Sequence, residues 1–218
     1  MSLRTLAILG LLLAAIGWWR SPYSPRVPAP PLPADGGGVH CPPPPAVAAG
    51  AAPLQTPVPR GMAQVALQDG TLTPLAGFSL EARVLSRRDY SLGREATFSP
   101  TDLALGWGPM RQDAVLSRLS ISQSSRWYHY RWQGSPPLPP AEIVRSSANM
   151  HMIPSSADVA AELRRVRRDD HVRIDGWLVR VDAPDGWRWI SSLKRDDSGA
   201  GACEVVYVCR IERQQGGS

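Results

Sequence analysis

The chain has 218 residues, enough for one folded domain with accessory segments but not for several large domains. Its formal net charge is +5, yet its basic residues are arginines except for Lys194, and alanine, glycine and proline are abundant, so charge alone does not indicate a nucleic-acid binder. Three cysteines without a CxxC motif argue against a structural zinc site.

The chain begins with an apolar run from Leu6 to Trp19, flanked by Arg4 and Arg20. The run is shorter than the roughly 20 residues of a typical membrane-spanning helix, so it fits both an uncleaved anchor and the apolar part of a cleaved signal peptide. A small-x-small cleavage site is hard to place after it, and the tryptophan pair beside Arg20 resembles an interfacial anchor. We therefore expect residues 1–20 to be a signal-anchor or transmembrane segment, with cleavage as the alternative.

Residues 21–60 follow, and proline, alanine and glycine dominate them. They hold too few large apolar side chains to offset the conformational entropy that is lost on ordering. This composition predicts a disordered tether in which the prolines favour extended conformations. A proline-rich segment could also bind an aromatic-lined groove, but the spacer hypothesis is favoured. We expect a globular domain over residues 61–213 and a disordered tail over residues 214–218.

The first half of this domain shows the signals of two strands and two short helices. Alternating apolar and polar residues over 78–90 predict a half-exposed strand. A serine N-cap, a proline at the first helical position and an aspartate in the first turn predict a short helix over 99–106. A second short helix is expected over 112–119 and a strand over 126–132. One face of that strand carries Arg126, Tyr128, Tyr130 and Trp132.

The second half contains the clearest helix of the chain, which is predicted over Ala157–Arg168 with Ser155 or Ser156 as its N-cap. The arginines on its outer side are more typical of a solvated face than of a polyanion contact. A hairpin follows, with an "APDG" turn and a return strand over 187–190. The apolar positions change parity at Gly176, which predicts a β-bulge that bends the first strand of the hairpin.

The chain ends with a strand predicted over Cys203–Ile211. Cys203 and Cys209 would lie about 20 Å apart along it, too far for a disulfide, so both are expected to be small buried thiols. Cys41 falls in the predicted tether. Together these elements predict an α+β fold that is mostly β, with a small, strongly curved sheet or a partly open barrel of the OB or nuclease-like kind and one main amphipathic helix.

Four segments, "SPTDLALGWGPM", "SANMHMIP", "GWLVRVDAPDGWRWISSL" and "DSGAGACEVVYV", carry a family resemblance. They resemble motifs of a group of short bacterial proteins that are described as uncharacterised membrane-anchored or exported proteins. The resemblance covers roughly residues 75–210. It implies location in the bacterial envelope and a shared domain. Together with the N-terminal segment, it leads us to expect a single-pass inner-membrane protein with its C-terminal domain in the periplasm, or a cleaved periplasmic protein. It implies no known activity.

The segment "SANMHMIP" holds the main candidate residues. Asn149 and His151 are two positions apart, so in an extended segment they point to one side. Met150 and Met152 then point to the other side, toward a core. We expect the polar pair to satisfy backbone groups of a neighbouring loop such as "SGAGAC", whose glycines permit close approach. In this hypothesis His151 is a structural strut and not a catalytic group.

A weaker hypothesis makes the same region an active site. The catalytic candidates are His151, Asn149, Cys203 and Glu204. A thiol, an imidazole and an amide are the parts of a nucleophile with an oriented base. A cysteine within a run of β-formers is expected to be buried, however, and no nucleophile elbow accompanies it. A metal site built from His129, His151 and a carboxylate such as Asp102 fits by residue type but not by spacing, so we predict no metal and no cofactor.

Four aromatic residues could instead line a cleft for a sugar, a peptide or a base. They are Trp107, Tyr128, Trp187 and Trp189. We therefore expect a membrane-tethered envelope domain that binds or scaffolds without catalysis. Its expected partners are the membrane, through the N-terminal segment, and an envelope polymer or protein, without specific nucleic-acid binding. The alternative is an envelope hydrolase, nuclease-like and metal-assisted, that uses His151 with Glu204.

Overall fold

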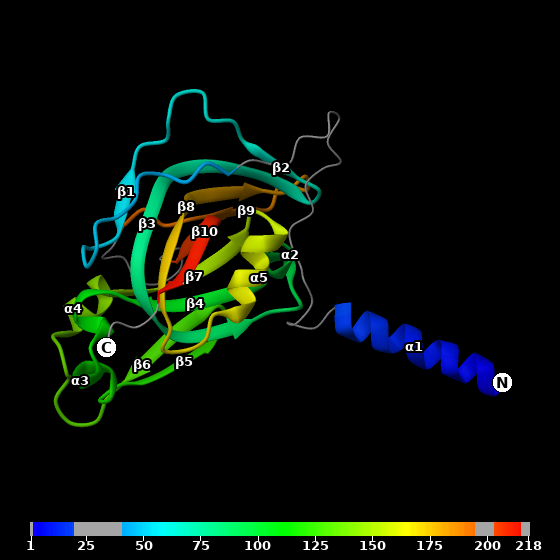
Figure 1. Cartoon of the computed structure of the whole chain (residues 1–218), viewed down its shortest axis with the longest axis horizontal. Helices are drawn as coiled ribbons and strands as arrows, with labels where there is room; N and C mark the ends of the chain where they lie inside the picture. The colour runs from blue at the N-terminus through cyan, green and yellow to red at the C-terminus, as the bar shows by residue number, and fades with distance from the viewer. Residues whose placement is uncertain (1, 20–40, 195–202, 215–218) are drawn as a thin grey trace.

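The computed structural model describes residues 2–19, 41–194 and 203–214 of the chain. The strands are β1 (Leu54–Thr56), β2 (Val65–Leu67), β3 (Gly70–Asp89), β4 (Thr101–Gly106), β5 (Ser120–Ser124), β6 (Trp127–Arg131), β7 (Ser147–Pro154), β8 (His171–Asp182), β9 (Arg188–Ile190) and β10 (Glu204–Gln214). The helices are α1 (Leu3–Trp19), α2 (Arg94–Phe98), the 3-10 helix η1 (Gly108–Arg111), α3 (Asp113–Leu116), α4 (Pro140–Arg145) and α5 (Ala157–Arg165). The protein is α+β and mostly strand, which confirms the predicted fold class (Figure 1).

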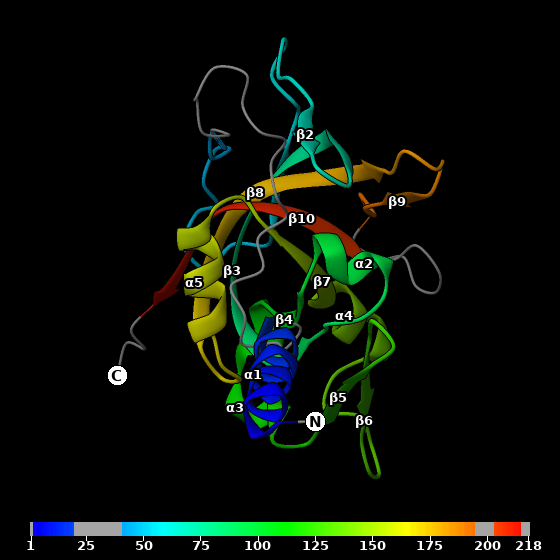
Figure 2. The ribbon, with the colours of Figure 1, turned by 90° about the vertical axis from the view of Figure 1, so that its right-hand side faces the viewer.

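Eight strands form one mixed sheet, in which hydrogen bonds close a ring through five of them. The long strand β3 curves around the molecule and pairs antiparallel with both β8 and β4 (Figure 1). Strand β4 pairs antiparallel with β7, β7 pairs parallel with β10, and β10 pairs antiparallel with β8. The remaining strands, β5 and β6, form a separate hairpin, which lies apart from α5 (Figure 2).

Irregular pairing accompanies the curvature of β3. An extra residue, Leu75, interrupts its register with β8, and another, Leu85, interrupts its register with β4. The bulge expected at Gly176 is wrong, because β8 itself pairs without an extra residue and the bulge lies opposite it, at Cys209 of β10. The sequence shows a change of parity at Gly176 because β8 is buried on both faces, between two apolar clusters.

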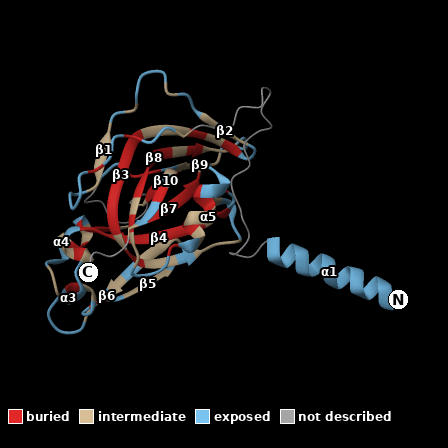
Figure 3. Ribbon diagram, in the orientation of Figure 1, coloured by how far each residue is buried: buried red, intermediate tan, exposed pale blue. Residues whose placement is uncertain are grey.

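The main core fills the inside of the ring, where the buried residues concentrate (Figure 3). Met150 and Met152 of β7 point into it, as predicted, and both are fully buried. Helix α5 adds Val159 and Leu163 to the same cluster. A second apolar cluster lies on the opposite face of β8 and β10, around Trp177. A third lies under the β5–β6 hairpin.

Helix α5 begins where the sequence predicts it, because the Ser156 side chain accepts a hydrogen bond from the Val159 N–H at the N-terminus. It ends at Arg165 and not at Arg168, since Val166 turns to an extended conformation and is buried in the core. The outer arginines make local contacts, for example Arg165 with Glu162 and Arg167 with backbone carbonyls. Such contacts agree with a solvated face.

The helix predicted over 99–106 is wrong, because this segment forms β4. Every residue of β4 is buried, and the strand pairs with β3 on one side and β7 on the other. Pairing on both sides outweighs the local capping signals. The Ser99 hydroxyl donates to the Thr101 carbonyl instead of capping a helix.

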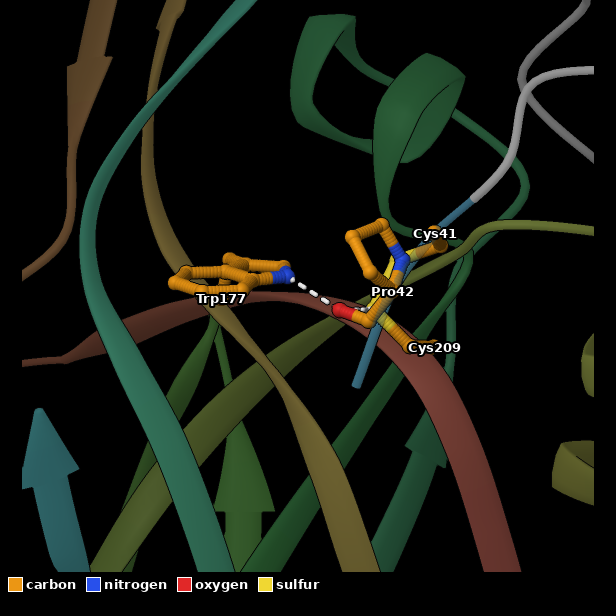
Figure 4. Close-up of a disulfide and its surroundings, with 4 residues drawn as sticks. All are labelled: Cys41, Pro42, Trp177 and Cys209. Carbon is orange, nitrogen blue, oxygen red and sulfur yellow. Dashed lines mark hydrogen bonds between the residues drawn. A yellow bond between two sulfur atoms is a disulfide. The ribbon is translucent and has the colours of Figure 1, made fainter. Parts of the chain in front are cut away.

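The tether predicted over 21–60 is wrong for its second half, because residues 41–58 form a strap that lies against β3 and β8. Cys41 is joined to Cys209 by a disulfide, so the prediction of a free, buried thiol at Cys209 is wrong. The Trp177 indole N–H donates to the Pro42 carbonyl at 2.9 Å beside this bond (Figure 4). Farther along the strap, the Val47 N–H donates to the Ser79 hydroxyl at 2.7 Å. These bonds order a segment whose composition supplies few large apolar contacts.

Strand β1 continues the strap by pairing antiparallel with β3. Its approach needs a glycine at position 77, because a Cβ there would lie 2.3 Å from Thr56 Oγ1 and 2.9 Å from Pro44 Cβ. Residues 21–40 and 215–218, the rest of the predicted tether and most of the predicted tail, lie outside the described residues. Within the described residues no helix, α1 included, is long and apolar enough to cross a membrane.

Candidate functional site

A polar patch lies on the outer face of β4 and β7, opposite the core methionines. The register places Asp102 directly across from His151, with Asn149 two residues farther along β7. All three side chains are buried, with exposed fractions of 0% for Asp102, 3% for His151 and 4% for Asn149. Buried polar groups on the outside of a sheet need partners, and these come from the β5–β6 hairpin.

The Asp102 carboxylate is the centre of the patch. Arg126 Nη1 donates to Asp102 Oδ1 at 2.8 Å, and His151 Nδ1 lies 2.9 Å from the same oxygen. The second contact is close enough for an ion pair, but the ring nitrogen is not aligned for a hydrogen bond. The other carboxylate oxygen, Oδ2, and Arg126 Nη2 are buried without a hydrogen-bond partner among the described residues.

Arg126 reaches Asp102 from the tip of the β5–β6 hairpin. Ser125 and Arg126 form a two-residue turn with φ values of 50° and 67°, a conformation that favours Asn-Gly and costs other residues about 1 kcal/mol each. Side-chain bonds to the sheet offset this cost. The Asn149 amide donates to the Arg126 carbonyl at 2.9 Å, and Gln123 donates to the Asn149 side-chain oxygen at 2.6 Å.

Aromatic rings enclose the charged groups. The Arg126 guanidinium lies 4.0 Å above the Tyr90 ring, and the Tyr90 hydroxyl accepts a hydrogen bond from the Arg126 backbone N–H at 3.0 Å. Burial raises the pKa of the Tyr90 phenol, so it stays neutral. The half-buried Trp189 ring lies 4.7 Å from the His151 ring and 5.9 Å from the Arg126 guanidinium.

The four aromatic residues predicted to line one cleft do not come together. Trp189 belongs to the patch. The Trp187 ring is stacked on Phe98, and its centroid lies 6.1 Å from that of the Trp189 ring. Trp107 is buried in the main core. Tyr128 packs under the β5–β6 hairpin, where its hydroxyl bonds to Ser147 and burial raises its pKa.

The predicted catalytic candidates come together in part, because the Asn149 amide and the Cys203 thiol both donate to the Arg126 carbonyl, whereas Glu204 lies apart. Asn149 and His151 lie together, but the parallel register places Glu204 beside Met150, on the opposite face of β7 from His151. Cys203 is half-buried, and its thiol donates to the Arg126 carbonyl at 3.9 Å. Most of the glycine-rich loop expected to contact Asn149 and His151 lies outside the described residues, and the contacts that the structure gives come from the hairpin.

Sequence reasoning missed Arg126 as the partner of Asp102. It placed Arg126 on a strand face with the aromatic residues that follow, whereas the structure places it in the turn. The turn has neither glycine nor asparagine, so no local signal marks it. The two residues lie 24 positions apart on different elements, so only the folded structure shows that they meet.

Among the described residues, no three histidine, cysteine or carboxylate side chains converge as metal ligands. Asp102 and His151 would supply only two metal ligands. The Arg126 guanidinium also offsets the negative charge of the Asp102 carboxylate, which a bound cation would need. His129 lies exposed on β6 and bonds to Ser124. The patch is therefore chemically suited to hold a polar ligand through hydrogen bonds.

Comparison with protein families, curated proteins and solved structures finds no match to this chain.

Proposed function

We propose that this protein is an exported envelope domain that binds a polar ligand at the Asp102–Arg126–His151 patch without chemically changing it. The disulfide between Cys41 and Cys209 supports export, because disulfides persist in oxidising compartments. The apolar helix α1 also supports export, because it falls short of a membrane-spanning helix but resembles the apolar region of a secretion signal.

The order of the ring strands supports a binding role. Counted along the chain, the five strands follow the order 1-2-3-5-4-1, with α5 between the third and the fourth, as in OB-type domains. Such domains bind ligands on the face of the second and third strands and on the loops after the first and fourth. The patch lies on that face, with Tyr90 on the first of these loops and Trp189 on the second.

One observation carries the proposal. The patch combines a fully buried carboxylate, a guanidinium and an imidazole, and several of their polar atoms have no hydrogen-bond partner among the described residues. Buried polar groups are normally satisfied, so such a concentration is typical of a site and not of a core. The Tyr90 and Trp189 rings beside these groups place apolar surface next to a few convergent polar groups, a combination that ligand sites share.

A hydrolase is the second candidate, and one contact favours it. Asp102 Oδ1 lies 2.9 Å from His151 Nδ1, near the position of a carboxylate that orients a general base. In this candidate Asp102 takes the role that the sequence assigned to Glu204. We favour binding, because Arg126 bonds to the same Asp102 oxygen that an orienting carboxylate would offer to His151.

Sedimentation of the purified full chain with an insoluble bacterial envelope fraction tests the proposal. We expect the wild type to sediment with the fraction, Trp189→Ala to remain in solution, and Trp132→Ala, which lies away from the patch, to behave like the wild type. The fraction should keep its mass profile after long incubation. If the wild type releases soluble fragments from the envelope fraction and His151→Asn does not, the result would favour the hydrolase. If the wild type fails to sediment and releases no fragments, both candidate functions would be overturned.

A further inference from the structure

We propose that the ligand of this patch is an uncharged sugar unit of an envelope glycan, stacked on Trp189 and hydrogen-bonded by Asp102 and Arg126. The inference rests on the proposed binding function and names its ligand class. Three properties of the patch carry it: its balanced charge, its mixture of donors and acceptors, and its aromatic border.

The charge of the patch is balanced. The Asp102 carboxylate is 2.8 Å from the Arg126 guanidinium, so the pair offers no surplus charge to a ligand. The neighbouring Trp187 lies beside a second balanced pair, Arg94 with Asp185 at 2.5 Å. A polyanion needs several uncompensated cations, and a cation needs uncompensated carboxylates. Among the described residues around the patch neither condition is met, which favours an uncharged ligand.

The polar atoms without partners are both donors and acceptors. Asp102 Oδ2 and Gln123 Oε1 can only accept hydrogen bonds, and Arg126 Nη2 can only donate them. A ligand that satisfies all three must donate and accept at neighbouring positions. A hydroxyl group does both with one atom, and a sugar ring carries several hydroxyl groups in a fixed geometry. Charged side chains also make the stronger hydrogen bonds to such groups.

Trp189 supplies the apolar contact. Its ring is half-buried, whereas Asp102 and His151 behind it are buried, so it forms the part of the patch that a ligand meets first. A sugar has an apolar face of C–H groups that packs on an aromatic ring. The combination of one ring with a carboxylate and a guanidinium therefore matches the two kinds of surface that a sugar unit presents.

The β5–β6 hairpin covers the polar atoms. It forms its own two-stranded sheet, and its tip is held to β4 and β7 by side-chain bonds from Asn149 and Asp102. A small outward movement of the tip would expose Asp102 Oδ2 and Arg126 Nη2 together.

Sedimentation with the envelope fraction, treated beforehand in two ways, tests the ligand class. We expect a glycosidase mixture to abolish binding of the full chain and protease treatment to leave it intact. Binding should change little between about 0.05 and 0.5 M NaCl, because an uncharged ligand is not screened by salt. Trp189→Ala should weaken binding about tenfold or more, and Trp189→Phe should restore most of it.

Matched outcomes separate this inference from the proposed function. Loss of binding after protease treatment, or a steep fall with salt, would overturn the sugar ligand and leave the binding function standing. No binding to the untreated fraction would remove the proposed function itself. Circular dichroism of each variant distinguishes loss of binding from loss of fold, and Trp132→Ala serves as the control for removing a tryptophan elsewhere.

Discussion

The Asp102 side chain is fully buried, and its carboxylate stands between a guanidinium and an imidazole. Substitution by alanine would leave the Arg126 charge nearly buried without its acceptor, which typically costs about 3 kcal/mol or more. We expect Asp102→Ala to lower the free energy of unfolding by that amount in urea titrations. Glu212→Ala, which removes an exposed pair with Arg210, should change it by less than about 1 kcal/mol. Equal effects would contradict the assignment of Asp102 as the centre of the patch.

His171 provides a pH-dependent contribution to stability. Burial lowers the pKa of its imidazole, and the nearby positive charges of Arg111 and Arg83 lower it further. The unfolded chain therefore binds a proton at a higher pH than the folded chain, near the ordinary value of about 6.5. The contribution of His171 is complete above about pH 7 and is lost as the pH falls below that value. Urea titrations at a series of pH values should show a shallower decline for His171→Asn, and an unchanged decline would disprove this role.

Single residues were predicted well where the pattern is local. The alternation of Met150 and Met152 with Asn149 and His151 follows from the two-residue period of a strand, and the structure confirms that the methionines enter the core. The pairing of Asp102 with Arg126 could not be predicted, because it depends on which strands become neighbours. The same is true of Glu204, which has the right chemistry for His151 but lies on the wrong face.

At the level of elements, the β5–β6 hairpin has an unusual turn. Ser125 is exposed and has a φ of 50°, which glycine adopts without steric cost. We expect Ser125→Gly to stabilise the protein by about 0.5 kcal/mol, because relief of the left-handed conformation exceeds the added entropy of the unfolded chain. Ser124→Gly, one residue earlier in regular β5, should destabilise it by a similar amount. Thermal unfolding of the two variants gives the comparison, and the same sign for both would contradict the turn geometry.

Elements with a self-contained signal were predicted, and elements defined by distant pairing were not. Helix α5 has an N-cap and an apolar stripe within one segment, and the structure confirms its start. Strand β4 has the local signals of a short helix, but it lies between β3 and β7 and its backbone groups are satisfied by them. The parity change at Gly176 led to the wrong prediction of a bulge in β8. The apolar residues change face there because β8 is buried on both faces, and that burial depends on the whole sheet.

For the whole molecule, the disulfide between Cys41 and Cys209 closes a loop of 168 residues. A cross-link of this separation restricts the unfolded chain and stabilises the native state by up to about 5 kcal/mol in the chain-entropy description. We expect a reductant to lower the melting temperature of the wild type by many degrees. The Cys41→Ser/Cys209→Ser variant should melt at the lower temperature with or without reductant. A wild type that is insensitive to reductant would show that the strap holds without its covalent bond.

The overall class was predictable, whereas the extent of the ordered domain was not. Predominance of strand signals around one amphipathic helix indicated a curved, mostly β fold, as observed. The composition of residues 41–58 indicates disorder, but a covalent bond and backbone contacts to Trp177 and Ser79 hold them. Composition measures how much apolar surface a segment can bury, and it does not register a cysteine partner far along the chain.

The same disulfide determines how the molecule would respond to mechanical load. A force that pulls on the chain ahead of residue 41 passes through two sulfur atoms directly into β10, and β10 is hydrogen-bonded along its length to β7 and β8. The intervening polypeptide is bypassed and cannot be unravelled from that end while the bond is intact. Because β7 also carries His151 and Asn149, the strand next to the loaded β10 lies directly under the polar patch.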